Sequence, residues 1–196
     1  MSVDTGDRRE LVYHVAVSLD GFIAAPDGDY SAFPVEGDHL AALLAEFTDT
    51  IPSHVQSALG LVADRSRFDT VLMGWNTYTP ALRAGIVSPY AHLRQIVVGS
   101  PGREVGPDVE LVQDPVATVR ELKAGSGASV YLAGGGHLAG SLLDEIDRVH
   151  LKVNPVVLGD GIPLFGRAGY RPRPFDTVGR RDFTSGVSFV ELVPRR

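Results

Sequence analysis

Three consecutive glycines, Gly134-Gly135-Gly136, carry the strongest chemical signal in this sequence. They follow a short apolar run, and a predicted helix that includes His137 and Leu138 begins directly after them. Glycine lets backbone approach a ligand closely, and the first N–H groups of a helix lack intrahelical partners, so the junction favours a phosphate. The alternative is a tight turn that needs glycine for a positive φ. The segment lacks both the Lys-Ser/Thr ending of a nucleotide-hydrolase loop and the Rossmann G-x-G-x-x-G spacing.

Two further junctions between a predicted strand and the segment after it carry similar residues. Gly74, Trp75 and Thr77 follow one strand, and Gly99-Ser100 follows another. Thr77 is suited to contact a phosphate, and Trp75 to stack on a base. Ligands of open parallel sheets bind beyond the carboxyl ends of the strands. If these strands are neighbours, the three junctions converge on one crevice.

Ser18 and Asp20 end the first predicted strand and face the same crevice. Asp20 is a candidate for substrate binding or proton transfer, and the alternative is that it closes a turn through side-chain-to-backbone bonds. The six histidines have no compact metal-ligand spacing, so no metal site is predicted. No serine lies in the G-x-S-x-G setting of a hydrolase nucleophile, which argues against acyl transfer.

Strands and helices alternate along most of the chain. Short β-branched, apolar runs predict strands, which lie at 11–18, 68–73, 95–98, 109–112, 129–133 and 148–154. Helical spacing and capping residues predict helices near 38–47, 53–63, 76–83, 115–124 and 137–143. A hairpin is expected from 177–183 and 187–192. This order predicts an α/β fold with a mainly parallel central sheet and an antiparallel C-terminal hairpin.

Composition limits the class of protein. A length of 196 residues predicts a single domain, which we place at 11–196 after a flexible N-terminal segment at 1–10. The formal charge of −6 argues against broad binding to nucleic acid or anionic membranes. The chain has no cysteine, its start is polar, and no apolar stretch approaches the ~20 residues of a membrane-spanning helix. We therefore expect a cytoplasmic protein.

Several segments, in order along the chain, resemble the dihydrofolate reductase-like superfamily. The resemblance is closer to the riboflavin-biosynthesis reductase domain, the C-terminal part of a bifunctional deaminase-reductase. The matching segments are 17–24, 71–78, 97–100, 130–138 and 154–165. Together they are specific for the fold and much less so for a substrate. The resemblance implies three layers around a mainly parallel sheet and an NADPH-dependent reductase.

The resemblance also implies roles for individual residues. Gly134 to Leu138 would hold the cofactor pyrophosphate, with Gly74 and Thr77 contacting the cofactor from the other junction. Ser100 would lie near the adenosine phosphate. Ala16 and Ser18 would line the nicotinamide side. Asp20 would lie at the substrate mouth, and we add Phe33 to Ser18 and Asp20 as candidate substrate-binding residues.

The sequence departs from its relatives at two places. Relatives commonly carry arginine where this chain has Trp75, so a preference for NADPH over NADH is open unless Arg103 supplies the missing charge. The stretch from Phe33 to Arg67 is long and falls where relatives shape the substrate pocket. Glu46 lies on its predicted helix, but no secure alignment gives it the acidic role found in dihydrofolate reductases.

The leading hypothesis is hydride transfer from NADPH to a small polar C=N or C=O acceptor, pterin- or pyrimidine-like by analogy. The alternative is a nucleotide-binding or interaction protein of the same fold without turnover. The natural substrate and the proton donor are not assigned, so no catalytic residue is named. A homodimer is expected, because such domains commonly pair and the C-terminal hairpin offers an exposed edge.

Overall fold

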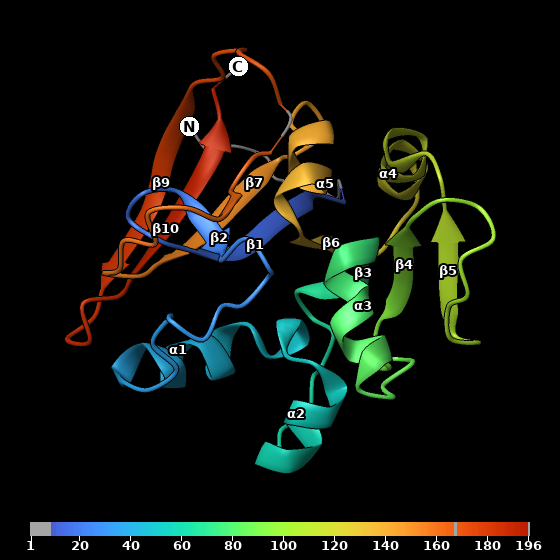
Figure 1. The fold of residues 1–196 in the computed structure, drawn as a ribbon, viewed down its shortest axis with the longest axis horizontal. Helices are drawn as coiled ribbons and strands as arrows, with labels where there is room; N and C mark the ends of the chain where they lie inside the picture. Colours follow the sequence, from blue (N-terminus) through green and yellow to red (C-terminus); the bar gives the residue numbers. More distant parts are fainter. Residues whose placement is uncertain (1–8, 167, 196) are drawn as a thin grey trace.

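A computed structural model describes residues 9–166 and 168–195 of the chain. Its centre is an eight-stranded sheet with the order β5-β4-β3-β6-β1-β7-β10-β9 (Figure 1). The strands are β1 (Leu11–Val17), β3 (Phe68–Gly74), β4 (Arg94–Val98), β5 (Val109–Val112), β6 (Ser129–Gly134), β7 (Arg148–Val153), β9 (Phe175–Asp182) and β10 (Ser188–Pro194). A separate two-stranded sheet pairs β2 (Phe22–Ala24) with β8 (Ile162–Pro163).

The six strands from β5 to β7 are parallel, and β10 and β9 are antiparallel. This confirms the predicted mainly parallel sheet with an antiparallel C-terminal hairpin. Because the parallel strands share a direction, their carboxyl ends lie at one edge of the sheet. Ser18, Gly74, Gly99 and Gly134 therefore all lie at that edge, where each follows or ends a strand.

Helices cover both faces of the sheet and complete three layers. They are α1 (Asp38–Glu46), the 3₁₀ turn η1 (Thr48–Thr50), α2 (Ser53–Leu59), α3 (Trp75–Arg83), α4 (Pro115–Ala124) and α5 (Gly136–Ser141). Apolar residues of α4 and α5 pack in one core with Leu11, Tyr13 and Leu132. Residues of α1 and α3 pack in the other core with Val12, Val71 and Tyr131. Figure 1 shows α1 and α2 on the opposite side of the sheet from α4 and α5.

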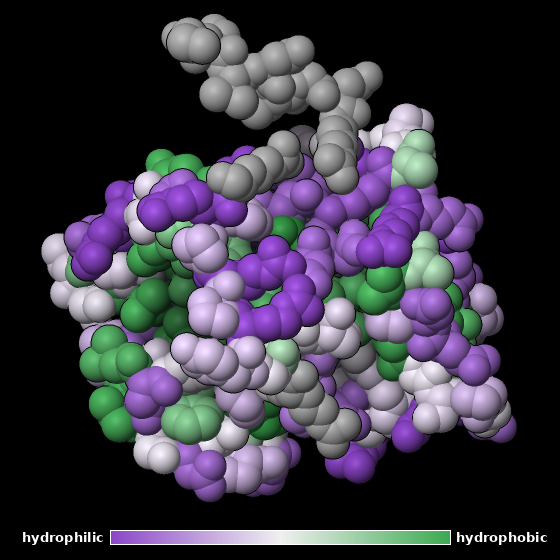
Figure 2. All heavy atoms as spheres, turned by 90° about the horizontal axis from the view of Figure 1, so that it is seen from above, coloured by the Kyte–Doolittle hydropathy of each residue, from purple (hydrophilic) through white to green (hydrophobic). Residues whose placement is uncertain are grey.

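The two cores follow from the alternation of side chains along each strand. Leu11 and Tyr13 on β1 face one core, and Val12 between them faces the other. A strand that is buried on both faces needs apolar residues at successive positions, which explains the apolar runs in the sequence. Seen from above, the surface is mostly hydrophilic with smaller hydrophobic areas (Figure 2). No helix among the described residues is long and apolar enough to cross a membrane.

The predicted elements differ from the structure mainly in their ends. The uncertain helix at 53–63 ends at Leu59, because Gly60 takes a left-handed conformation that closes it. The short strands β2 and β8 and the turn η1 were not predicted, because two or three residues carry no periodicity. Most of the segment expected to be flexible, 1–10, lies outside the described residues. Its last two residues form defined contacts. Arg9 donates hydrogen bonds to the Ala128 carbonyl oxygen and the Thr70 hydroxyl, and Glu10 forms an ion pair with Arg148.

Candidate functional site

The starts of α3 and α5 meet at the carboxyl edge of the sheet. Met73 on β3 is paired with Gly134 on β6, so the two strand-to-helix junctions are neighbours. A Cβ on Gly74 would lie 3.5 Å from the carbonyl oxygen of Gly134 and 3.6 Å from the nitrogen of Gly135. Gly134 has a φ of 104°, a left-handed conformation that glycine adopts readily. Two of the three predicted junctions are therefore adjacent.

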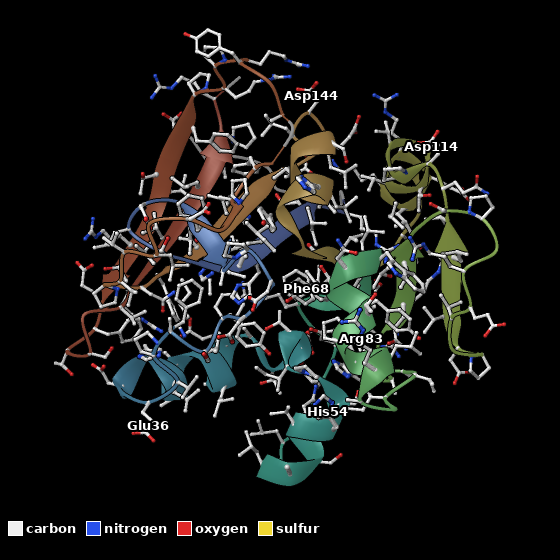
Figure 3. The ribbon with its side chains drawn as sticks, viewed as in Figure 1. Glu36, His54, Phe68, Arg83, Asp114 and Asp144 are labelled. Atoms are coloured by element: carbon white, nitrogen blue, oxygen red, sulfur yellow. The ribbon has the colours of Figure 1, made fainter. Side chains whose placement is uncertain are left out.

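Both helices have a glycine as N-cap, and no described side chain caps them. The N-cap residue is Gly74 for α3 and Gly135 for α5, and neither helix start receives a side-chain hydrogen bond. At α4, by contrast, the N-cap residue is Asp114 (Figure 3). Its carboxylate accepts a 2.9 Å bond from the N–H of Ala117. Because the first N–H groups of a helix have no intrahelical partners, those of α3 and α5 remain available to an anion.

The space beside Gly135 is bounded by residues from three elements. A Cβ added to Gly135 would lie 3.6 Å from the Thr77 hydroxyl oxygen and 4.0 Å from the terminal methyl of Ile23. Gly135 has a φ of −80°, so its backbone conformation does not by itself require glycine. Its missing side chain instead leaves room between the two helix starts, close to a hydroxyl donor on α3.

The third junction joins the first two through Trp75. A Cβ on Gly99, after β4, would lie 3.6 Å from the Trp75 ring and 3.4 Å from the Arg103 side chain. The Arg103 guanidinium lies over the Trp75 ring, 4.3 Å from its centroid, which is the geometry of a cation–π contact. Ser100, the next residue after Gly99, is exposed. A positive charge thus lies at the start of α3, beside the third junction.

The remaining residues of the glycine segment take different positions. A Cβ on Gly136 would lie 1.9 Å from the carbonyl oxygen of Pro163, so this glycine permits close packing of α5 on β8. The Leu138 side chain is in the core, only 8% exposed, which leaves its backbone N–H as the group able to face a ligand. His137 is exposed at the start of the helix.

Ser18 and Asp20 bind each other and the protein. The Ser18 hydroxyl donates a 2.6 Å bond to Asp20 and accepts one from the N–H of Phe22. The Asp20 carboxylate also accepts bonds from the N–H groups of Leu158 and Gly159, at 3.1 and 2.7 Å. These bonds, with that of Ser18 the largest contribution, lower the pKa of Asp20 to about 2. The carboxylate is ionised at neutral pH and ties two loops together.

The other two predicted residues lie on the side of the sheet covered by α1. Phe33 is 5% exposed, in the loop before α1. Ala16 is on β1, directly beside Lys152 on β7. The Lys152 ammonium donates a 2.8 Å bond to the carbonyl oxygen of Pro34, the residue after Phe33. Lys152 was not among the predicted site residues, although the alternating polar residues His150, Lys152 and Asn154 indicate a polar face on this strand.

Comparison with known proteins places the chain in a family. The model of the family described as the RibD C-terminal domain matches residues 9–188. The chain belongs to the RibD C-terminal domain family. The matching relatives include two uncharacterized proteins of Bacillus subtilis (strain 168). YwjB is 32% identical over 164 residues, covering 80% of this chain and 83% of YwjB. YyaP is 26% identical over 200 residues, covering 95% and 94%.

Similar solved structures identify the fold of this RibD C-terminal domain. A putative riboflavin biosynthesis protein from Shewanella sp. PV-4 superposes with a TM-score of 0.69 and 22% identity, covering 95% of this chain and 99% of that one. The dihydrofolate reductase of Enterococcus faecalis, solved with NADP(H), superposes with a TM-score of 0.63 and 13% identity, covering 95% and 97%. The domain therefore has the dihydrofolate reductase-like fold, as the sequence motifs predicted.

Proposed function

We propose that this RibD C-terminal domain is an NADPH-dependent reductase that transfers hydride to a small polar heterocyclic or C=N/C=O substrate. One observation carries the proposal. The starts of α3 and α5, each capped by a glycine without a side-chain partner, face each other across Gly74 and Gly135. Two sets of backbone N–H groups at one point suit the paired phosphates of a dinucleotide. The family match and the NADP(H)-bound neighbour support the same reading.

The residues present fit a dinucleotide. In this proposal a phosphate approaches the two helix starts over Gly135, which has no side chain to block it, and Thr77 adds a hydroxyl donor. Arg103, on the Trp75 ring, would pair with the extra phosphate that distinguishes NADPH from NADH. When bound, the reduced nicotinamide supplies the hydride. The protein's part is to orient it beside Ala16 and to position the acceptor.

A glycine-to-alanine substitution tests this proposal through binding. Gly135→Ala puts a methyl group between the helix starts at an ordinary contact distance, so the fold should tolerate it while phosphate is excluded. We expect the unsubstituted chain to show a change in Trp75 fluorescence on titration with NADPH, and Gly135→Ala to bind at least tenfold more weakly. Gly125→Ala, at the far end of α4, is the matched control and should bind normally. If the unsubstituted chain binds neither NADPH nor NADH at millimolar concentration, the proposal is wrong.

A second candidate is a dinucleotide-binding protein without turnover. It is favoured because the carboxylates near the proposed substrate side already have protein partners. Asp20 accepts hydrogen bonds from loop amides, Asp38 accepts them from Thr184 and Ser185, and Glu46 forms an ion pair with Arg181. None of these three carboxylates is left unbonded to act as a proton donor. NADPH oxidation with a panel of carbonyl and C=N acceptors separates the two functions. Tight NADPH binding with no turnover on any acceptor would favour the second.

A further inference from the structure

Among the residues that the structure describes, Lys152 is a cation without an anionic partner. Only two of the 18 lysine and arginine residues are lysines, Lys123 and Lys152. Lys123 is 6% exposed and forms an ion pair with Asp147. Within residues 9–166 and 168–195, Lys152 forms no ion pair, and its one protein hydrogen bond goes to the Pro34 carbonyl oxygen. A half-buried ammonium with a single neutral partner has two N–H groups left for another acceptor.

The register of the sheet places this cation at the proposed reaction site. His14 on β1 and His150 on β7 are paired and their side chains meet at 3.0 Å, so they project from the same face. Two residues further along, Ala16 and Lys152 are paired on that face, next to the carboxyl edge. Ala16 has a small side chain, so the lysine is not covered from β1. Lys152 therefore lies between the residue expected at the nicotinamide and the loop that carries Phe33.

Within the described part of the chain, no carboxylate forms an ion pair with Lys152. The acidic residues that α1 and β10 contribute are engaged elsewhere: Asp38 with Thr184 and Ser185, Glu46 with Arg181, and Glu191 with Arg148. The positive charge of Lys152 instead contributes to lowering the pKa of His14 on β1 and of His39 on α1, for both of which burial is the larger cause. Burial also lowers the pKa of Lys152 itself. A partly desolvated cation in these surroundings favours an oxygen acceptor from a ligand.

We propose that the Lys152 ammonium binds the carbonyl oxygen of the molecule to be reduced and gives it a proton. This inference rests on the proposed reductase function and narrows its substrate class to carbonyl compounds. Arginine at this position would serve poorly as a proton donor, because a guanidinium does not release its proton at accessible pH. The alternative role for Lys152 is only to hold the Pro34 loop against the sheet.

The charge of Lys152 selects between the two acceptor types. When a carbonyl carbon accepts the hydride of reduced nicotinamide, a C–H bond forms and the C=O π pair moves to oxygen, which takes a proton from Nζ. The products are an alcohol, oxidised nicotinamide and a neutral amine that solvent reprotonates. A C=N group is a good hydride acceptor when it is protonated and positive, and an adjacent ammonium opposes that state. Lys152 therefore favours C=O over protonated C=N.

Reductive alkylation of the two lysines tests the proposal on the intact, unsubstituted protein. Pyridine-4-carboxaldehyde forms an imine with a lysine amine, with loss of water, and sodium cyanoborohydride reduces that imine to a stable product. Peptide mass spectrometry then gives separate rates for Lys152 and for Lys123, the internal control. We expect Lys152 to react at least tenfold faster than Lys123. We expect saturating NADPH to slow Lys152 at least fivefold, because nicotinamide beside Ala16 would close the approach, and to leave Lys123 unchanged.

Trp75 fluorescence, recorded in the same samples, separates two kinds of failure. If NADPH binds but the rate at Lys152 stays the same, or if Lys152 reacts no faster than Lys123, Lys152 is a loop anchor and the inference is wrong. If NADPH leaves Trp75 unchanged up to millimolar concentration, the proposed function fails and the inference fails with it. Lys152→Arg, which keeps the charge and a donor for Pro34, should lose the fast alkylation and so confirms the assignment of the reactive site.

Discussion

At the scale of single residues, the contact between Arg103 and Trp75 bears on the proposed preference for NADPH over NADH. The Arg103 guanidinium lies over the Trp75 ring, 4.3 Å from the ring centroid. The charge is thus supplied from the loop after β4 and oriented by the indole. Among the described residues Arg103 forms no ion pair, in contrast to Arg94, which is paired with Glu110. We therefore expect Arg103 to bind the extra phosphate of NADPH.

Arg103→Gln should weaken the binding of NADPH without weakening that of NADH. A charge-assisted hydrogen bond contributes roughly 1.5–3 kcal/mol, so we expect about a tenfold or greater rise in the NADPH dissociation constant. Isothermal titration calorimetry with both nucleotides measures the difference. Arg180→Gln, which removes an exposed arginine on β9, is the control. Equal losses for NADPH and NADH would contradict a role for Arg103 at the extra phosphate.

At the scale of elements, the position of α5 depends on two glycines. Cβ atoms on Gly136 and Gly140 would lie 1.9 and 2.0 Å from the carbonyl oxygens of Pro163 and Gly166. The N–H of Gly166 also donates a 2.9 Å bond to the carbonyl oxygen of Gly136. The segment that follows β8 therefore lies directly against the backbone of α5. This contact fixes where the N–H groups at the start of α5 point.

Gly136→Ala should destabilise the fold, because its methyl group would meet backbone that has no side-chain rotamer to change. Overpacking of this kind costs about 1–3 kcal/mol of unfolding free energy. Urea denaturation followed by circular dichroism measures the change. Gly125→Ala, whose Cβ would have only ordinary contacts, should stay close to the unsubstituted protein. Unchanged stability in Gly136→Ala would show that α5 does not pack as closely as described.

At the scale of the whole molecule, a buried histidine pair connects the sheet to the helical layer. His14 and His150 meet at 3.0 Å, and the Phe47 ring stacks on His14 at 4.4 Å. Burial lowers the pKa of His150 from 6.5 to about 4 and, together with the charge of His150, lowers that of His14 well below 6.5. Both rings are therefore neutral in the folded protein at neutral pH.

The histidine pair predicts a loss of stability in mild acid. Below pH 6.5 the histidines of the unfolded chain become protonated. In the folded protein, His150 becomes protonated only when the pH nears 4. The contribution of the neutral histidines to the free energy of unfolding is therefore fully present above pH 6.5. It falls as the pH drops from 6.5 towards 4, by up to about 1.4 kcal/mol per pH unit for each histidine. Urea denaturation between about pH 5 and pH 7.5 measures the slope. If a His14→Leu/His150→Leu variant kept the full slope of unfolding free energy against pH, the slope would come from other titratable groups and the prediction would be wrong.

Self-association is also a property of the whole molecule. β9 is an outer strand of the eight-stranded sheet, and Val178 on it is 53% exposed. An edge strand offers unpaired backbone groups to a second copy, so we expect a homodimer through this strand. Sedimentation velocity should give a dimer at micromolar concentration. Val178→Lys should shift the equilibrium towards monomer, and a monomer in the unsubstituted chain at that concentration would contradict the expectation.

The sequence by itself determined the α/β order, the parallel sheet and the three glycine junctions. Those features are local: apolar periodicity marks each strand, and Gly74, Gly99 and Gly134 lie within a residue of the strand ends they mark. Only the tertiary structure decided which of these residues lie next to one another. Asp20 bonds to Gly159 across 139 positions, and Ala16 meets Lys152 through strand register. Such pairings depend on how strands align in space, and a residue's own neighbours in the chain carry no information about that alignment.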